Sequence, residues 1–189
     1  MIKIAVFASG SGSNAESIAK YFREHDNIRV TLFVTNSSKA GVIERGKKLD
    51  ISVLVIKNDQ LNSPSLFEEL KNQEINYIVL AGFLRLLPKE LIDQYPEKII
   101  NIHPSLLPKY GGKGMYGMNV HKAVAKAGES ETGLTIHLVN TEYDKGKILF
   151  RKKVKILPMD KAEDIAARVL RWEHDCYPKV IEDYLLKSS

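Results

Sequence analysis

The sequence IKIAVFASGSGSN, residues 2–14, decides the fold class of this chain. Its first seven residues form a nearly continuous apolar run, which is typical of a strand buried on both faces of a parallel sheet. A loop of alternating serine and glycine follows, and a helical pattern begins at Asn14. A strand, a glycine loop and a helix in this order predict the start of a doubly wound α/β sheet.

The same alternation continues through the chain, where apolar runs predict strands and amphipathic runs predict helices. The further expected strands are 30–35, 51–56, 77–81, 98–103, 132–139 and 148–155. The expected helices are 14–24, 41–49, 64–73 with Ser65 and Glu68 as a capping box, 120–126 and 161–186. We therefore expect an α/β fold with a Rossmann-like parallel sheet in the N-terminal half, extended by a mixed C-terminal part.

The composition excludes several classes of protein. The chain has 189 residues, a formal net charge of +5 and one cysteine. No basic run is interleaved with aromatic residues, so we expect no nucleic-acid partner and interpret the basic residues at 145–147 and 151–153 as solvated surface. Cys176 alone cannot form an internal disulfide, which favours a reducing cytoplasm, and we interpret it as a packed residue.

No membrane partner is expected either. The chain shows no signal-peptide pattern, and no apolar run approaches the ~20 residues that span a bilayer. We expect small-molecule partners, and the sequence leaves monomer and homodimer both open.

The glycine loop predicts an anion site, because backbone N–H groups and the positive end of a helix converge there and glycine lets an anion approach closely. The candidate phosphate ligands are Gly10, Ser11, Gly12, Ser13 and Asn14. The spacing also fits a loose dinucleotide fingerprint, but residues 35–38 lack the carboxylate that NAD binding expects. We favour a monophosphate, and a tight turn without a ligand is the other alternative.

The segment Asn101-Ile102-His103 predicts a polar site at the end of a strand. Residues two apart share one face of a strand, and ligands of open α/β sheets bind beyond the carboxyl ends of the strands. An amide donor and an imidazole on one face can hold a carbonyl oxygen and stabilise the oxyanion formed by attack on it. Asp144 can orient the imidazole and favour its cation. The alternative is that Asn101 and His103 only cap the strand end.

Several segments together resemble the folate-dependent formyltransferases, and the likeness covers nearly the whole chain. The similar segments are 9–14, 81–87, 101–110, 132–137, the turn that ends at Asp144, and Glu173-His174. The segment 101–110 reads Asn101-Ile102-His103-Pro104-Ser105-Leu106-Leu107-Pro108-Lys109-Tyr110. Its form is most similar to the branch of the family that acts on glycinamide ribonucleotide in purine biosynthesis.

The resemblance implies one formyltransferase domain, 1–189, with a phosphate-binding half at 1–100 and a catalytic half at 101–189. The amine of the ribonucleotide would attack the formyl carbon of the cosubstrate 10-formyltetrahydrofolate, and no metal would be needed. Asn101 and protonated His103 would stabilise the oxyanion. Asp144 would sustain that protonation and take part in proton relay.

The resemblance also implies binding roles. Glu173 would hold the ribose or the glycinamide end of the substrate. The folate would contact Leu84, Arg85, Leu86, Leu87 and Asn101, with Arg85 either on the folate or in solvent. We expect His137 to support the site without contacting substrate, and His121 to pair locally on the helix that follows the loop. The stripe expected to pack the last helix is Ile165, Val169, Trp172 and Tyr177.

Two features depart from the family pattern. The loop at 111–121 is longer than the common Pro-Gly-x-His form, and it is either a lid or a longer surface loop. The segment 63–70 lacks the arginine that many members use near the folate tail or the substrate.

Other functions share parts of this pattern. Methionyl-tRNA formyltransferases usually carry an added C-terminal domain, and formyltetrahydrofolate deformylases an N-terminal one, and we expect neither here. Sugar-nucleotide formyltransferases share the catalytic residues, but the phosphate loop and Lys109-Tyr110 disfavour them. A non-catalytic folate or nucleotide binding module and an NAD-dependent oxidoreductase are the remaining alternatives.

Overall fold

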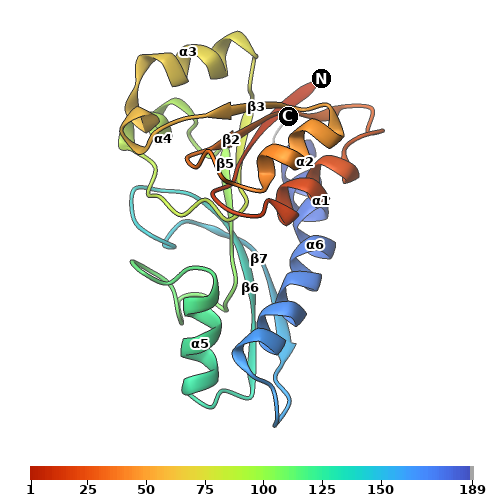
Figure 1. Cartoon of the computed structure of the whole chain (residues 1–189), viewed down its shortest axis with the longest axis vertical. Helices are drawn as coiled ribbons and strands as arrows, with labels where there is room; N and C mark the ends of the chain where they lie inside the picture. Colours follow the sequence, from red (N-terminus) through yellow and green to blue (C-terminus); the bar gives the residue numbers. More distant parts are fainter. Residues whose placement is uncertain (188–189) are drawn as a thin grey trace. The chain divides into compact units, whose positions relative to one another are not determined.

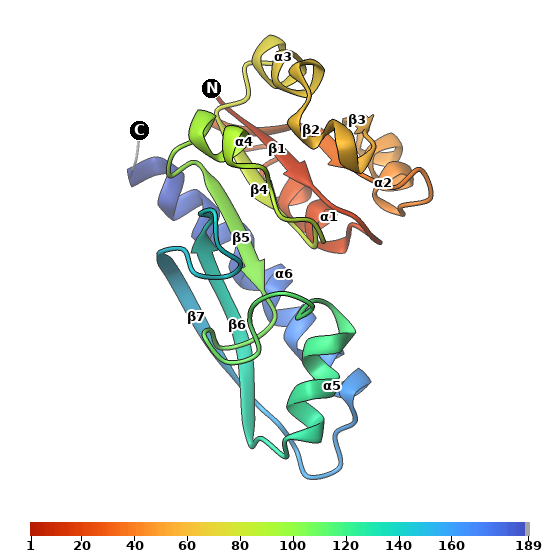
Figure 2. The ribbon, with the colours of Figure 1, turned by 90° about the vertical axis from the view of Figure 1, so that its left-hand side faces the viewer.

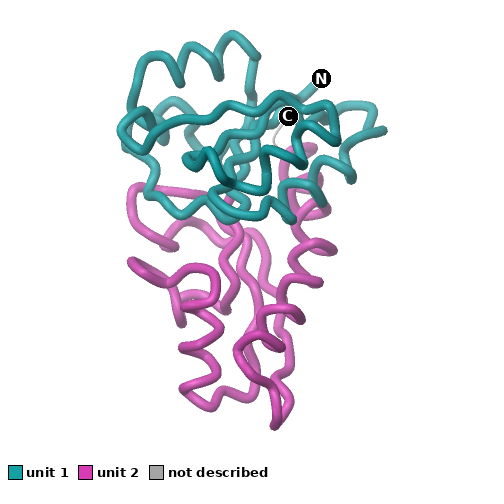
Figure 3. The backbone as a smooth tube through the Cα atoms, viewed as in Figure 1, with its two compact units in different colours: residues 1–100 teal, residues 101–189 magenta. Residues whose placement is uncertain are grey.

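The structure, a computed structural model, describes residues 1–187 and divides them into two compact units, residues 1–100 and residues 101 onward (Figures 1 and 3). Seven strands follow the hydrogen-bonded order β3-β2-β1-β4-β5-β6-β7. The expected α/β class with a mixed, mostly parallel sheet is therefore confirmed.

The first unit is a doubly wound α/β arrangement. Its strands are β1 (Ile2–Phe7), β2 (Ile28–Thr35), β3 (Ser52–Val55), β4 (Tyr77–Leu80) and the start of β5 (Ile99–His103). Its helices are α1 (Ser13–Tyr21), α2 (Val42–Leu49), the 3-10 helix η1 (Asn58–Asn62), α3 (Pro64–Asn72) and α4 (Lys89–Gln94). β1 pairs in parallel with both β2 and β4, and β2 pairs in parallel with β3.

This strand order creates a switch point between β1 and β4. The chain moves outward from β1 to β3 and then returns to β4, so right-handed crossovers place α1 and α2 on one face and α3 on the other (Figure 1). Ligands of such sheets bind beyond the strand ends at the switch point. The glycine loop leaves β1 at this position, where the Ser9 N–H donates to the Gly82 carbonyl at 3.1 Å.

The second unit combines an antiparallel ribbon with two helices. β6 (Glu131–Leu138) pairs with β7 (Ile148–Lys155), and α6 (Ala162–Lys187) packs against both strands and against α5 (Met118–Lys126) (Figure 2). Ile165, Val169 and Tyr177 of α6 are buried, as expected. The expectation for Trp172 is wrong, because its side chain is 37% exposed and its ring lies under the Lys152 ammonium at 4.1 Å.

Other expectations about single elements also need correction. The predicted strands lie within two residues of the observed bounds. β3, one of the two edge strands of the sheet, is not buried on both faces. The capping box at Ser65 and Glu68 is wrong: α3 is capped by Ser63, whose hydroxyl accepts the Leu66 N–H at 3.3 Å. The short elements η1 and α4 were not expected.

No helix within residues 1–187 is both long and apolar enough to cross a bilayer.

Candidate active site

The glycine loop has the conformation of an anion site in the first unit. Gly12 caps α1 with a φ of 75°, in the left-handed region that favours glycine. A Cβ atom at this position would lie 2.6 Å from the Cβ atom of Val42. No side chain caps the start of α1, so the first N–H groups of this helix have no partner from a capping side chain.

Arg45 of α2 supports the loop from outside. Its Nε atom donates to the Ser11 carbonyl at 2.7 Å, and its guanidinium pairs with Glu16 on α1. No pattern in the sequence predicts this role of Arg45. An arginine inside a helix gives no local signal that it reaches back to an earlier loop.

Ser9 connects the glycine loop to the predicted folate segment. Its hydroxyl accepts the Leu84 N–H at 3.0 Å and donates to the Asn36 amide oxygen at 2.7 Å. Leu84 and Leu86 are exposed, whereas Leu87 is only 3% exposed and belongs to the core. Leu84 and Leu86 are therefore the leucines of this segment that can pack against a ring, and Arg85 is exposed as well.

In the second unit, β5 presents Asn101 and His103. His103 is 4% exposed, and its Nε2 atom lies 2.8 Å from the Tyr110 carbonyl oxygen. Because a carbonyl oxygen only accepts, the neutral imidazole carries its proton on Nε2 and leaves Nδ1 bare. The Nδ1 atom faces the Asp144 carboxylate at 3.6 Å.

Asp144 lies on the turn between β6 and β7 and faces two histidines. Its Oδ1 atom is 3.6 Å from Nε2 of His137, and its Oδ2 atom accepts the Gly112 N–H at 2.8 Å. Burial opposes ionisation of this carboxyl, but His137, His103 and the Gly112 N–H together outweigh it and hold its pKa below the ordinary value. Asp144 is therefore ionised at neutral pH.

His137 fixes the orientation of Asn101. Its Nδ1 atom lies 2.8 Å from the Leu138 carbonyl and so carries the proton of the neutral ring. Its Nε2 atom then accepts a hydrogen bond from the Asn101 amide nitrogen at 3.1 Å. The structure thus brings Asn101, His103, His137 and Asp144 into one cluster.

Desolvation governs the charge of the buried histidines. Burial lowers the pKa of His103, although Asp144 and the Tyr110 carbonyl act in the opposite direction. His121 of α5 is 5% exposed, and burial, with a smaller effect from His103, lowers its pKa to about 4. Both imidazoles are therefore neutral at pH 7 in the protein without substrate, which differs from the protonated His103 that the resemblance implies.

Glu173 is a buried carboxylate on α6, 7% exposed. Burial and the neighbouring Glu173 raise the pKa of Tyr177 well above its ordinary value. Within residues 1–187, no group of three or more histidine, cysteine or acidic side chains is arranged to hold a metal ion.

The basic residues of β7 are not only solvated surface. Arg151 donates from Nη2 to the Leu107 carbonyl at 2.6 Å and so braces the segment after His103. The Tyr110 carbonyl and the Gly112 N–H also belong to the site, and neither is predicted from the sequence. Backbone groups leave no side-chain pattern from which such roles can be recognised.

Comparisons with known proteins find relatives that match nearly the whole chain. A phosphoribosylglycinamide formyltransferase of Arabidopsis thaliana, named as chloroplastic, is 42% identical over 186 residues, which are 95% of this chain and 64% of that protein. The chain thus spans less than two thirds of this plant relative. The protein of the same name from Bacillus subtilis is 36% identical, and the match covers 98% of this chain and 95% of that protein.

A solved structure is similar over almost its full length. The crystal structure of phosphoribosylglycinamide formyltransferase from Bacillus halodurans has a TM-score of 0.89 at 33% identity, covering 99% of this chain and 97% of that one. The sequence also matches the formyl transferase family over residues 2–181. This chain therefore belongs to the formyl transferase family.

Proposed function

We propose that this protein is a phosphoribosylglycinamide formyltransferase. It transfers the formyl group of 10-formyltetrahydrofolate to the amine of 5-phosphoribosylglycinamide in de novo purine biosynthesis. The cluster of Asn101, His103, His137 and Asp144 carries this proposal, because it joins an amide donor, an imidazole and an ionised carboxylate in a buried site. The names of the relatives and the likeness over nearly the whole chain support the choice of substrates.

The reaction is a transfer of an acyl group between two nitrogens. The amine nitrogen attacks the formyl carbon, and the formyl oxygen becomes an oxyanion. The bond between this carbon and N10 of the folate then breaks, and the proton lost by the amine ends on N10. The formyl group arrives already activated on N10, so the proposed reaction needs no metal.

Asn101 and His103 stabilise the oxyanion in this proposal. The Asn101 amide gives one N–H to His137, which leaves its second N–H for the formyl oxygen. The bare Nδ1 atom of His103 takes up a proton as the attacking amine becomes acidic. The growing oxyanion and Asp144 then both favour the imidazolium, which resolves the difference between the neutral resting state and the protonated role.

The substrates bind at both the glycine loop and the segment after β4 in this proposal. We assign the substrate phosphate to residues 10–14 at the start of α1, and the ribose or glycinamide end to Glu173. We assign the folate to the segment 84–87 and to Asn101. Asn36 stands where NAD-binding folds carry an acidic residue and is bonded to Ser9 and Asn58, which disfavours an oxidoreductase.

We also propose the assembly and the compartment in which the protein acts. All the assigned residues come from one chain, so the proposal holds for a monomer or a homodimer. One cysteine fits a reducing compartment, and we assign the protein to the cytoplasm, although the Arabidopsis relative is named as chloroplastic. We propose neither a nucleic-acid nor a membrane partner.

A folate absorbance assay tests the function. The protein is incubated with 10-formyltetrahydrofolate or its dideaza analogue, with and without phosphoribosylglycinamide. We expect turnover only with the amine present. Equal rates without it would indicate a deformylase, and tight binding without turnover would indicate a binding module.

The variant His103→Ala tests the catalytic assignment. We expect turnover to fall by at least about a hundredfold, because general acid–base catalysis contributes about that much, with substrate binding retained. His25→Ala, which removes a histidine of the first unit, is the control and should keep turnover. Activity surviving in His103→Ala would show that the proton role is wrong.

A further inference from the structure

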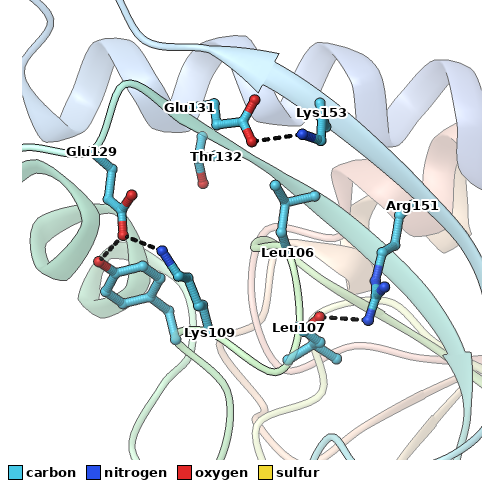
Figure 4. Close-up of a pocket in the computed structure, with 9 residues that line it drawn as sticks. Leu106, Leu107, Lys109, Glu129, Glu131, Thr132, Arg151 and Lys153 are labelled. Carbon is cyan, nitrogen blue, oxygen red and sulfur yellow. Dashed lines mark hydrogen bonds and ion pairs between the residues drawn. The ribbon is translucent and has the colours of Figure 1, made fainter.

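Two lysine–glutamate pairs line a cavity of the second unit (Figure 4). Lys109 pairs with Glu129 at 3.0 Å, and Lys153 pairs with Glu131 at 2.8 Å. The two pairs differ in one respect. Glu129 also accepts the Tyr110 hydroxyl at 2.9 Å, so it holds two consecutive residues of the segment that follows the Asn-x-His motif.

Tyr110 links this cavity to the catalytic cluster, because its hydroxyl binds Glu129 while its carbonyl oxygen holds Nε2 of His103 at 2.8 Å. Two residues later, the Gly112 N–H binds Oδ2 of Asp144, the oxygen that faces Nδ1 of the same imidazole. The short segment 110–112 thus holds His103 on one side and its carboxylate partner on the other.

The backbone of this segment has a conformation that needs contacts from other residues to persist. Tyr110 has a φ of 56° and Gly112 a φ of 95°. The left-handed region is sparsely populated by residues other than glycine and persists where surrounding contacts hold it. The Tyr110 side chain, held by Glu129, supplies such a contact.

We propose that Glu129 is a positioning residue for formyl transfer, which acts through Tyr110 to keep the segment 110–112 on His103 and Asp144. The inference rests on the proposed function for its kinetic consequence. The contacts of Glu129, Tyr110 and Gly112 are present in the protein without substrate, so they can be tested without measuring formyl transfer.

Two titratable groups act on the pKa of His103: Asp144 on the β6–β7 turn raises it, and His137 on β6 lowers it. His121 on α5 is the third titratable group near this ring, and its own pKa is lowered by His103. The Tyr110 carbonyl is the remaining polar contact, and it raises the pKa of His103 against the larger effect of burial. Losing this contact therefore lowers the pKa of His103 further and frees the proton on Nε2 to move to Nδ1.

The experiment compares Tyr110→Phe, Glu129→Ala and Glu129→Gln with the wild-type chain. Nitrogen NMR of the imidazoles follows the tautomer and pKa of His103 in the unliganded protein, and steady-state kinetics follow kcat and KM. In Tyr110→Phe and Glu129→Ala we expect a lower pKa of His103 and less Nε2-protonated tautomer. We also expect kcat to be about fivefold lower and KM for the ribonucleotide to be unchanged, because small displacements of reacting groups lower the rate of the chemical step.

Glu129→Gln keeps an acceptor for the tyrosine hydroxyl and should restore most of kcat. Glu131→Ala is the matched control, because it breaks the other lysine–glutamate pair of the same cavity without touching Tyr110. The double variant Tyr110→Phe/Glu129→Ala should be no slower than either single variant, because both remove the same link.

Unchanged His103 signals and unchanged kcat in Tyr110→Phe would overturn the proposal, and so would an equal effect of Glu131→Ala. The NMR experiment separates the two proposals. If the His103 signals shift as expected but the wild-type chain transfers no formyl group, the link from Glu129 through Tyr110 to His103 stands, whereas the proposed function and the kinetic role in formyl transfer fail. Tyr110→Phe carries the test if Glu129→Ala does not fold.

Discussion

His103 and His137 each point one ring nitrogen at a backbone carbonyl, and this decides the chemistry of the other nitrogen. The Tyr110 carbonyl fixes a proton on Nε2 of His103, and the Leu138 carbonyl fixes one on Nδ1 of His137. The opposite nitrogens face Asp144, and that of His137 also receives the Asn101 amide. In these tautomers one ring nitrogen of each histidine carries no proton and faces the same carboxylate, so the cluster has acceptors that can take up a proton.

His121, the third buried histidine of this unit, leads us to predict how the stability of the protein depends on pH. His121 has an ordinary pKa of 6.5 when unfolded and about 4 when folded, and its Nδ1 atom has no partner. Above pH 6.5 the residue is neutral in both states and adds no pH dependence. Below that pH the unfolded chain takes up the proton first, so stability falls until about pH 4, by about 3 kcal/mol in total.

His121→Leu should remove this part of the acid sensitivity. Denaturant unfolding at pH 7 and at pH 4.5 measures it. The loss of unfolding free energy between the two pH values should be smaller in the variant than in the wild-type chain, by about 2 kcal/mol. Equal losses in the two proteins would show that His121 does not stay neutral when folded.

At the scale of elements, the loop between β1 and α1 depends on one glycine far more than on its neighbour. A Cβ atom at Gly12 would lie within 2.8 Å of Val42 atoms in a left-handed backbone, whereas a Cβ atom at Gly10 would meet nothing within 4 Å. We expect Gly12→Ala to lower the unfolding free energy by about 1–3 kcal/mol and Gly10→Ala to leave it nearly unchanged. Thermal unfolding of the two variants measures the difference, and similar midpoints would contradict it.

The elements also show what the sequence could predict. Long apolar runs such as those of β1 and β2 gave the parallel strands within two residues, because burial on both faces leaves an unambiguous pattern. The six-residue helix α4 was missed, since one and a half turns after Pro88 carry too few apolar positions to show a period. Ser65 and Glu68 fit the capping-box motif, whereas the residue three positions after Ser63 is Leu66. The structure nevertheless caps α3 with the Ser63 hydroxyl, which accepts the Leu66 N–H.

The sequence predicted the parts of the site that side chains form, but not the contacts made by backbone groups. The two-residue period of a strand placed Asn101 and His103 on one face, and Asp144 was expected on the turn between the strands predicted at 132–139 and 148–155. His137 was expected near the site, but its hydrogen bond to Asn101 crosses between strands and has no sequence signal. Tyr110 and Gly112 hold His103 and Asp144 through backbone atoms. A pattern of side chains in the sequence cannot predict such contacts.

At the scale of the whole molecule, charge is the property that acts at a distance. The chain carries a net charge of +5, while the proposed substrate bears a phosphate and the proposed donor a carboxylate. Many of the cations near the surface are paired with carboxylates, as Lys20 is with Glu16 and Lys89 with Asp93. The excess of positive charge is therefore a field summed over the molecule rather than one basic patch.

This field predicts how catalytic efficiency depends on salt. Raising the ionic strength from about 0.01 M to about 0.15 M shortens the Debye length from about 30 Å to about 8 Å, so attraction of an anion over the molecular surface is largely lost. We expect kcat/KM for phosphoribosylglycinamide to fall about threefold over this range, with kcat at saturation nearly constant, because steering acts on encounter and not on the bound complex. The nucleoside without its phosphate is the matched control and should show a flatter dependence. Equal salt dependence of the two amines would mean that the net charge of +5 does not guide the phosphate to the glycine loop.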